Sequence, residues 1–203
     1  MANNDKTLTY DASLNARHIS TDLEHYEAAR SNFFTLIVDG LDDIIKATYT
    51  GDPEDATDGD RIHKAQETLK LNVVQASVPH FQLNPISYTR GNEVVKFAGT
   101  PSWNSASIEV DDVVGKDTKG ILMAWQALAY HVSDGRGGRM KDYKKTATLV
   151  EYTQDYQQIR AWRLYGCWVS NITEGNFDRG GGRGDLRRLT ATIEYDRAEM
   201  LEV

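Results

Sequence analysis

The chain has 203 residues, a mass of 22.8 kDa and a formal net charge of −7. This length fits one domain, or one domain with arms, and the hydrophobic share of 40% is that of an ordinary soluble globular protein. Residues 1–60 carry 13 acidic and 4 basic side chains, whereas residues 61–203 carry 17 and 19. The chain has no concentrated basic region of the kind that a general nucleic-acid-binding protein shows, which argues against that class.

The N-terminal region predicts an arm and a short helix. Residues 1–20 are polar and show no basic-then-apolar signal sequence, so we expect an arm there and a single domain over 21–203. Residues 21–24, Thr-Asp-Leu-Glu, match a capping box, which predicts a helix from Asp22 to about Arg30.

Strand patterns dominate the rest of the chain. Short apolar or alternating runs bounded by turn-forming residues predict strands. They occur at 33–38, 44–49, 68–76, 85–88, 93–97, 104–110, 145–152, 158–172 and 189–195. The segment Thr89-Arg90-Gly91-Asn92 predicts a hairpin turn, and the run 51–61, which is acidic and has no large apolar residue, predicts a loop.

One main helix is predicted at 117–132, with Asp117 as its N-cap. An apolar stripe at helical spacing supports it, formed by Ile121, Leu122, Trp125, Leu128, Ala129 and Val132. Because the strands do not alternate with helices, we expect a mainly β fold. Two packed antiparallel sheets would form a sandwich or barrel, with this helix across an open face.

The predicted strand at 158–172 carries large side chains on both faces. Simple alternation puts one set on one face, Ile159, Ala161, Tyr165, Cys167 and Val169, and a second set on the other, Trp162, Leu164, Trp168 and Ile172. A strand that is apolar on both faces must be covered on both, here by the helix and by a neighbouring subunit. This indicates an assembly protein. We expect five residues in the core or at a subunit interface, namely Trp125, Trp162, Leu164, Tyr165 and Trp168.

No pattern predicts a catalytic, cofactor or metal site. The five histidines lack metal-binding spacing, and the acidic loop at 51–61 does not fit the register of an EF-hand. The glycine-arginine segments at 136–139 and 178–185 lack the P-loop pattern, and Cys167 reads as a buried small hydrophobe. No apolar run approaches the ~18 residues of a membrane span. We therefore expect neither an enzyme nor membrane insertion.

Three segments, taken in order, resemble the tail tube proteins of contractile-tailed bacteriophages. They are residues 26–43, YEAARSNFFTLIVDGLDD; residues 73–100, VVQASVPHFQLNPISYTRGNEVVKFAGT; and residues 159–178, IRAWRLYGCWVSNITEGNFD, followed by TATIEYDRAEM. The likeness spans roughly residues 24–200. The acidic insertion at 51–61 and the two glycine-arginine loops depart from the family pattern.

The resemblance implies a structural role. Such proteins form hexameric rings that stack into the hollow inner tube of the tail, inside the sheath and around the tape-measure protein, between baseplate and tail terminator. It implies a virion protein that is assembled in the bacterial host cytoplasm, with DNA passing through the lumen without specific binding. The alternative is the tube of a type VI-like secretion system or other contractile injection system. A monomeric β-sandwich binding module is a more distant alternative.

Charge suggests roles for two further groups of residues in such a tube. Complementary charge fixes register between subunits, which predicts ring stacking through an acidic set and a basic set: Asp52, Glu54, Asp55, Asp58 and Asp60, with Arg136, Arg139 and Arg183. A conduit for DNA should be acidic or neutral inside. Three acids on predicted strands are therefore the lumen candidates, Glu109, Glu151 and Glu194.

Overall fold

The computed structural model describes residues 29–41, 65–113, 117–175 and 187–201. The chain divides into two units, residues 1–32 and 33–203, and every element below belongs to the second. The predicted arm, most of the first helix, the strand at 44–49 and the acidic loop lie outside the described residues.

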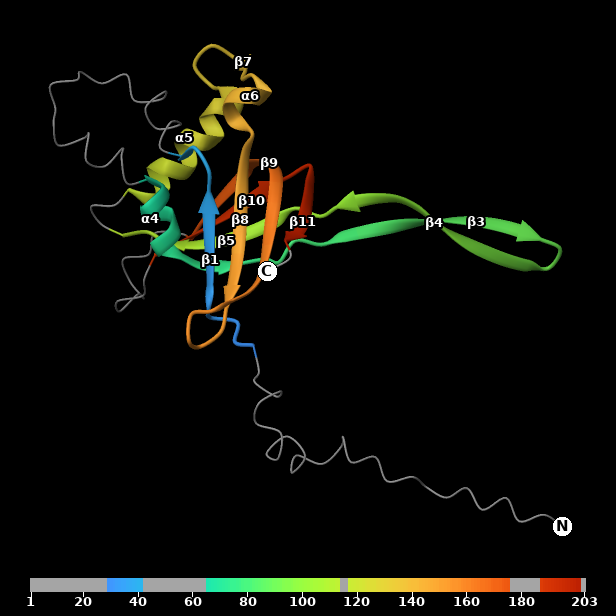
Figure 1. The fold of residues 1–203 in the computed structure, drawn as a ribbon. Coiled ribbons are helices and arrows are strands. Elements are labelled where there is room, and N and C mark those ends of the chain that lie inside the picture. The colour runs from blue at the N-terminus through green and yellow to red at the C-terminus, as the bar shows by residue number, and fades with distance from the viewer. Residues whose placement is uncertain (1–28, 42–64, 114–116, 176–186, 202–203) are drawn as a thin grey trace, which may run out of the picture. The chain divides into compact units, whose positions relative to one another are not determined.

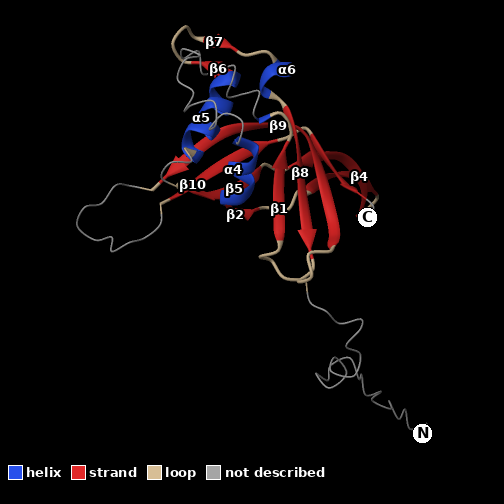
Figure 2. Cartoon of the chain, turned by 60° about the vertical axis from the view of Figure 1, so that its left-hand side comes forward, coloured by secondary structure: helices blue, strands red, loops and turns tan. Residues whose placement is uncertain are grey.

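The fold is mainly β, as predicted, and consists of antiparallel sheets with a few short helices. Its two main sheets share one long strand, β9 (Gln158–Glu174) (Figures 1 and 2). The first half of β9 pairs on one edge with β8 (Lys145–Tyr152) and on the other edge with β11 (Arg197–Leu201). β8 in turn pairs with β1 (Phe34–Val38). The second half pairs with β10 (Arg188–Glu194), followed by β5 (Ala106–Asp111) and β2 (Val73–Ala76).

A bulge at Gly166 lets β9 pass from one sheet into the other. Ala147 of β8 lies opposite Leu164, but Lys145, two residues earlier, lies opposite Cys167, so β9 has one extra residue here. Gly166 has a φ of +70°, which favours glycine. The segment that pairs with the other edge of β9 is also interrupted here, between β10 and β11, where the Asp196 N–H donates to the Tyr165 carbonyl at 2.9 Å. Bulges bend a strand and are the usual means of turning a sheet corner.

The bulges overturn the predicted alternation along β9. A second register shift follows between Val169, opposite Ile193, and Asn171, opposite Thr192. Leu164, Cys167 and Val169 are all buried in the core, although simple alternation placed Leu164 on the other face from the last two. Trp162 and Trp168, predicted to share a face, lie on opposite faces, because each bulge reverses which side of the strand faces the core.

Two of the described helices cover the core. The first, α4 (Ala65–Asn72), occupies half of the segment predicted as a strand at 68–76, so that prediction holds only for β2. Its buried residues, Ala65, Thr68 and Leu69, follow helical spacing. The second is α5 (Thr118–Ala129), and its N-cap is Asp117 as predicted, with the carboxylate accepting the Gly120 N–H at 3.0 Å.

The main helix α5 is shorter than predicted. It ends at Ala129, and the next residues form a short hairpin of β6 (Tyr130–His131) and β7 (Arg136–Gly137), followed by α6 (Met140–Tyr143). The Gly138 N–H donates to the Ala129 carbonyl at 3.0 Å, and a side chain at Gly138 would overlap the Leu128 carbonyl. The returning chain therefore ends the helix. Val132, predicted on the buried stripe, is 86% exposed.

Polar side chains of α5 bind it to the rest of the domain. Trp125 is fully buried, and its indole Nε1–H donates to the Tyr143 carbonyl at 2.8 Å. The Gln126 amide donates to the Ser170 carbonyl at 3.0 Å, at the second bulge of β9. One helix thus contacts both α6 and the irregular part of the shared strand.

Candidate assembly surfaces

A long hairpin extends away from the two main sheets (Figure 1). It consists of β3 (Phe81–Arg90) and β4 (Glu93–Trp103), which among the described strands pair only with each other. Both strands are longer than predicted, and the turn at Gly91-Asn92 is confirmed by the pairing of Arg90 with Glu93. At its base, the Trp103 ring lies 5.0 Å from the Phe81 ring and 5.9 Å from the Tyr195 ring. Beyond that base, almost every residue of the hairpin is exposed.

One face of the outer hairpin is apolar. Ile86 lies opposite Phe97 and Tyr88 lies opposite Val95, so the four side chains share a face. They are 59%, 56%, 57% and 46% exposed, in that order. We call them the hairpin face. A two-stranded hairpin alone is marginally stable in water, and a contiguous exposed apolar patch marks an interaction site. The part of the chain that the structure describes leaves the hairpin face exposed, so we expect a partner to cover it.

The five residues predicted for the core or an interface separate into three environments. Trp125 and Leu164 are buried, and Trp162 packs against the core while remaining partly exposed. Tyr165 lies on the opposite face of the sheet, with the Arg197 guanidinium 4.5 Å from its ring centre. Trp168 also lies on an outer face, half-buried, with its ring 5.9 Å from that of Tyr143 in an edge-on arrangement.

The three lumen candidates do not share one face. Glu109 and Glu194 lie on the face of the second sheet that points away from the core, since their neighbours Ile108 and Ile193 point inward. Glu151 lies opposite Phe34 at the end of the first sheet, on the side that faces the core, and pairs with Arg160 at 3.5 Å.

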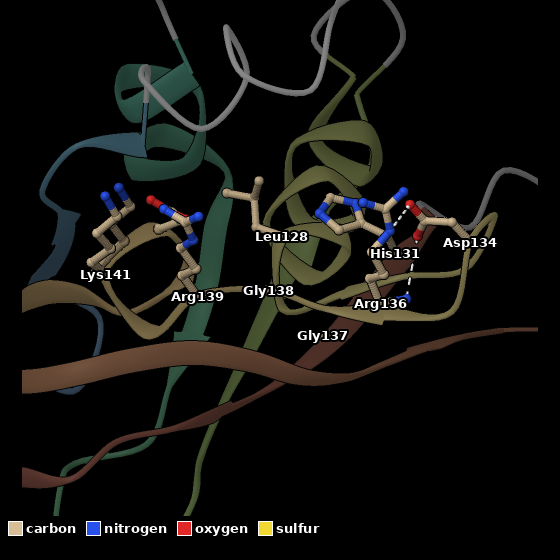
Figure 3. A pocket seen from close by; sticks show the side chains of 10 residues that line it. Leu128, His131, Asp134, Arg136, Gly137, Gly138, Arg139 and Lys141 are labelled. Carbon is tan, nitrogen blue, oxygen red and sulfur yellow. Dashed lines mark hydrogen bonds and ion pairs between the residues drawn. The ribbon is translucent and has the colours of Figure 1, made fainter.

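A pocket of about 690 Å³ lies beside the end of α5 (Figure 3). Ten residues line it: Leu128, His131, Asp134, Arg136, Gly137, Gly138, Arg139, Lys141, Asp142 and Lys145. We call it the basic pocket, because four of these side chains are Lys or Arg and two are Asp. It brings together Arg136 and Arg139, two of the predicted ring-stacking residues. The others, Asp52, Glu54, Asp55, Asp58, Asp60 and Arg183, lie outside the described residues.

An ion-pair cluster closes the opposite end of α5. Lys119 lies 2.5 Å from Glu174, and Arg187 contacts both Glu174 and, at 3.4 Å, Asp112. The Lys119 ammonium, hydrogen-bonded to Glu174, is the main cause of a lowered pKa for that carboxyl, and Arg187 contributes to it. The cluster joins α5 to the ends of β9, β10 and β5.

Sequence reasoning missed the hairpin face and two cations of the basic pocket, Lys141 and Lys145. The signal for the hairpin face was present, because two pairs at alternating positions flank a turn. Within the described residues there is no group of His, Cys, Asp or Glu suited to hold a metal ion. That part of the chain also contains no helix long and apolar enough to cross a membrane.

No protein-family model matches the chain, and no curated protein matches it significantly. Solved structures do. A chain of the sheath-tube complex of PVC, an extracellular contractile injection system in the extended state, aligns over 91% of this chain and 97% of its own, with 15% identity and a TM-score of 0.58. A chain from the tube-terminating cap of the anti-feeding prophage covers 87% and 93%, with 12% identity and a TM-score of 0.57.

A third match comes from the baseplate of the anti-feeding prophage. It covers 86% of this chain and 95% of the other, with 11% identity and a TM-score of 0.54. The chain has the fold found in contractile injection assemblies. The alignments cover almost the whole of each partner, so the likeness concerns an entire subunit.

Proposed function

We propose that this protein is the tube subunit of a contractile injection particle. Copies of the chain would form hexameric rings, and the rings would stack into a hollow tube inside a sheath. The observation that carries this proposal is the hairpin face, four apolar side chains on a projecting arm that no described part of the chain covers. In a closed ring of identical copies, every arm meets the same neighbouring surface, so all arms are covered at once.

The likeness to chains of PVC and the anti-feeding prophage supports the general class, a tube of a contractile injection system, better than it supports a phage tail in particular. A phage tail tube that carries DNA is the narrower form of the proposal. In either case the partners would be a sheath, a baseplate, a terminator and a tape-measure protein, and the protein would reside in a tail-like particle.

The edges of the main sheets fit this role. β2 ends the second sheet, and β11 has β9 on one side only among the described strands. Exposed strand edges invite uncontrolled pairing unless a partner covers them. Ring closure would cover them in a defined way.

The test is assembly of the purified protein, observed by negative-stain electron microscopy and sedimentation. Wild type should form rings or tubes, and the double variant Ile86→Asp/Phe97→Asp should remain a folded, small species. The matched control is Ser87→Asp/Thr89→Asp, on the other face of the same strand, and it should assemble. A monodisperse wild-type monomer under all conditions would favour a β-sandwich binding module instead.

A further inference from the structure

The basic pocket has cations that the described part of the chain leaves without acidic partners. Arg136 is bound to Asp134, with Nε 2.9 Å from a carboxylate oxygen, and the Asp134 side chain also accepts the Arg136 N–H. Among the described residues, Arg139, Lys141 and Lys145 have no ion pair, and Asp142 is the one further acid in the lining. The lining therefore has an excess of two positive charges.

The shape and surroundings of the basic pocket suit a peptide segment rather than a small ion. A volume of about 690 Å³ accommodates several side chains. Gly137 belongs to the lining, and a Cβ there would meet nothing within 4 Å, so a backbone can approach closely at this residue. Two exposed apolar side chains occur in the same short elements, Tyr130 of β6, 55% exposed, and Met140 of α6, 60% exposed. An extended acidic segment could make both kinds of contact.

We propose that the basic pocket binds the acidic segment at residues 51–61 of a neighbouring copy. That segment is the densest acidic run of the chain, with five carboxylates and one arginine, and residues 1–60 as a whole have a net charge of −9. Complementary charge of this kind fixes which surfaces meet, and in what register. The inference rests on the proposed function, since the neighbouring copy is supplied by the assembled tube.

Ionic strength should control this contact. Exposed ion pairs are individually weak and are screened by salt. Every subunit of a ring repeats the contact, so the small contributions add along the tube. Assembly of wild type should therefore require a higher protein concentration as salt rises.

A disulfide trap tests the contact directly. The variant Asp55→Cys/Arg139→Cys is assembled, oxidised mildly and run on a non-reducing gel, with each single variant as control. Cys167 is buried, so it should contribute few cross-links of its own. We expect a ladder of linked chains from the double variant alone. A cross-link within single chains, or none, would overturn the proposal.

Charge reversal gives an independent test. Arg139→Glu/Lys141→Glu should raise the concentration needed for assembly by about fivefold per lost ion pair at most. Adding Asp55→Lys/Asp58→Lys should restore it. The control Lys70→Glu/Lys96→Glu changes the net charge equally, away from the pocket. If the pocket variant assembles like this control, the pocket contact is wrong while the tube stands. If wild type itself forms no rings or tubes, the proposed function fails.

Discussion

The Lys144 ammonium binds both oxygens of the Asp196 carboxylate, at 2.7 and 2.8 Å. Lys144 directly precedes β8, and Asp196 lies at the break between β10 and β11, so the pair joins both edges of the corner in β9. The carboxylate occupies the space beside Gly166, where any side chain would overlap it. The corner therefore requires glycine for its positive φ and for its lack of a Cβ.

Gly166→Ala should destabilise the subunit by about 1–3 kcal/mol, because alanine is strained at this φ and its Cβ would displace Asp196. Thermal unfolding followed by circular dichroism measures the effect. Gly175→Ala is the matched control, since a Cβ there meets nothing within 4 Å. Equal melting temperatures for the two variants would contradict the strained corner.

Trp125→Ala and Trp168→Ala should fail in different ways. Trp125 is fully buried and donates a hydrogen bond, so its truncation should cost about 3–5 kcal/mol and prevent folding. Trp168 is half-buried on an outer face, so its variant should keep more stability as an isolated subunit but lose tube formation. Unfolding curves and electron microscopy of both variants check this. Normal tubes from Trp168→Ala would remove Trp168 from any interface.

Cys167 should be chemically inert in the folded protein. It is completely buried, and that burial raises the pKa of its thiol to about 12 from an ordinary 9.0. Because the thiolate is the reactive form, a thiol reagent at pH 8 should label it only after denaturation. The folded state holds this proton more tightly than the unfolded chain does, so the thiol lowers stability as pH rises from about 9 towards 12. Rapid labelling of native protein would contradict the burial.

Glu174 should make the domain sensitive to acid. Lys119 and Arg187 hold the pKa of this carboxyl below its ordinary 4.5, so its stabilising effect is present above that value and is lost as pH falls through the lowered pKa. The melting temperature of Glu174→Gln should be below that of wild type at pH 7, and the difference should shrink at low pH. A difference in melting temperature that stays constant from pH 7 to pH 3 would show that the ionised form of Glu174 does not stabilise the domain.

The sequence predicted the strands whose residues alternate simply, such as β5 and β8, because one face of each meets the core. It did not predict the faces of β9, since a bulge inserts one residue and reverses every side chain that follows. Gly166, a glycine inside a strand, was a usable signal for the first bulge; the second, at Ser170-Asn171, had only a polar pair. No turn-forming residue separates α4 from β2 in the sequence, so the apolar pattern was interpreted as one strand. The helical conformation of α4 is instead favoured by burial of Thr68 and Leu69 against the domain.

The site was less predictable than the fold. The side chains of the hairpin face are apolar, and from a single sequence a pair of apolar strands is predicted to belong to the core. Only the paired register and the exposure of Ile86 and Phe97 show that the hairpin projects from the domain. The basic pocket depends on where the chain turns after Ala129. The apolar stripe predicted that α5 continues to residue 132, so this turn was not predicted.

A strand that belongs to both sheets also affects how the protein is made. β1 is synthesised early, but its partner β8 follows only after β5 and α5, and the second sheet must wait for the same β9. Such long-range pairing folds slowly and leaves unpaired strands exposed meanwhile. We therefore expect the nascent chain to remain without either complete sheet until its last quarter has left the ribosome. During that time the apolar side chains of β3 and β4, which are synthesised before β9, remain exposed to other chains.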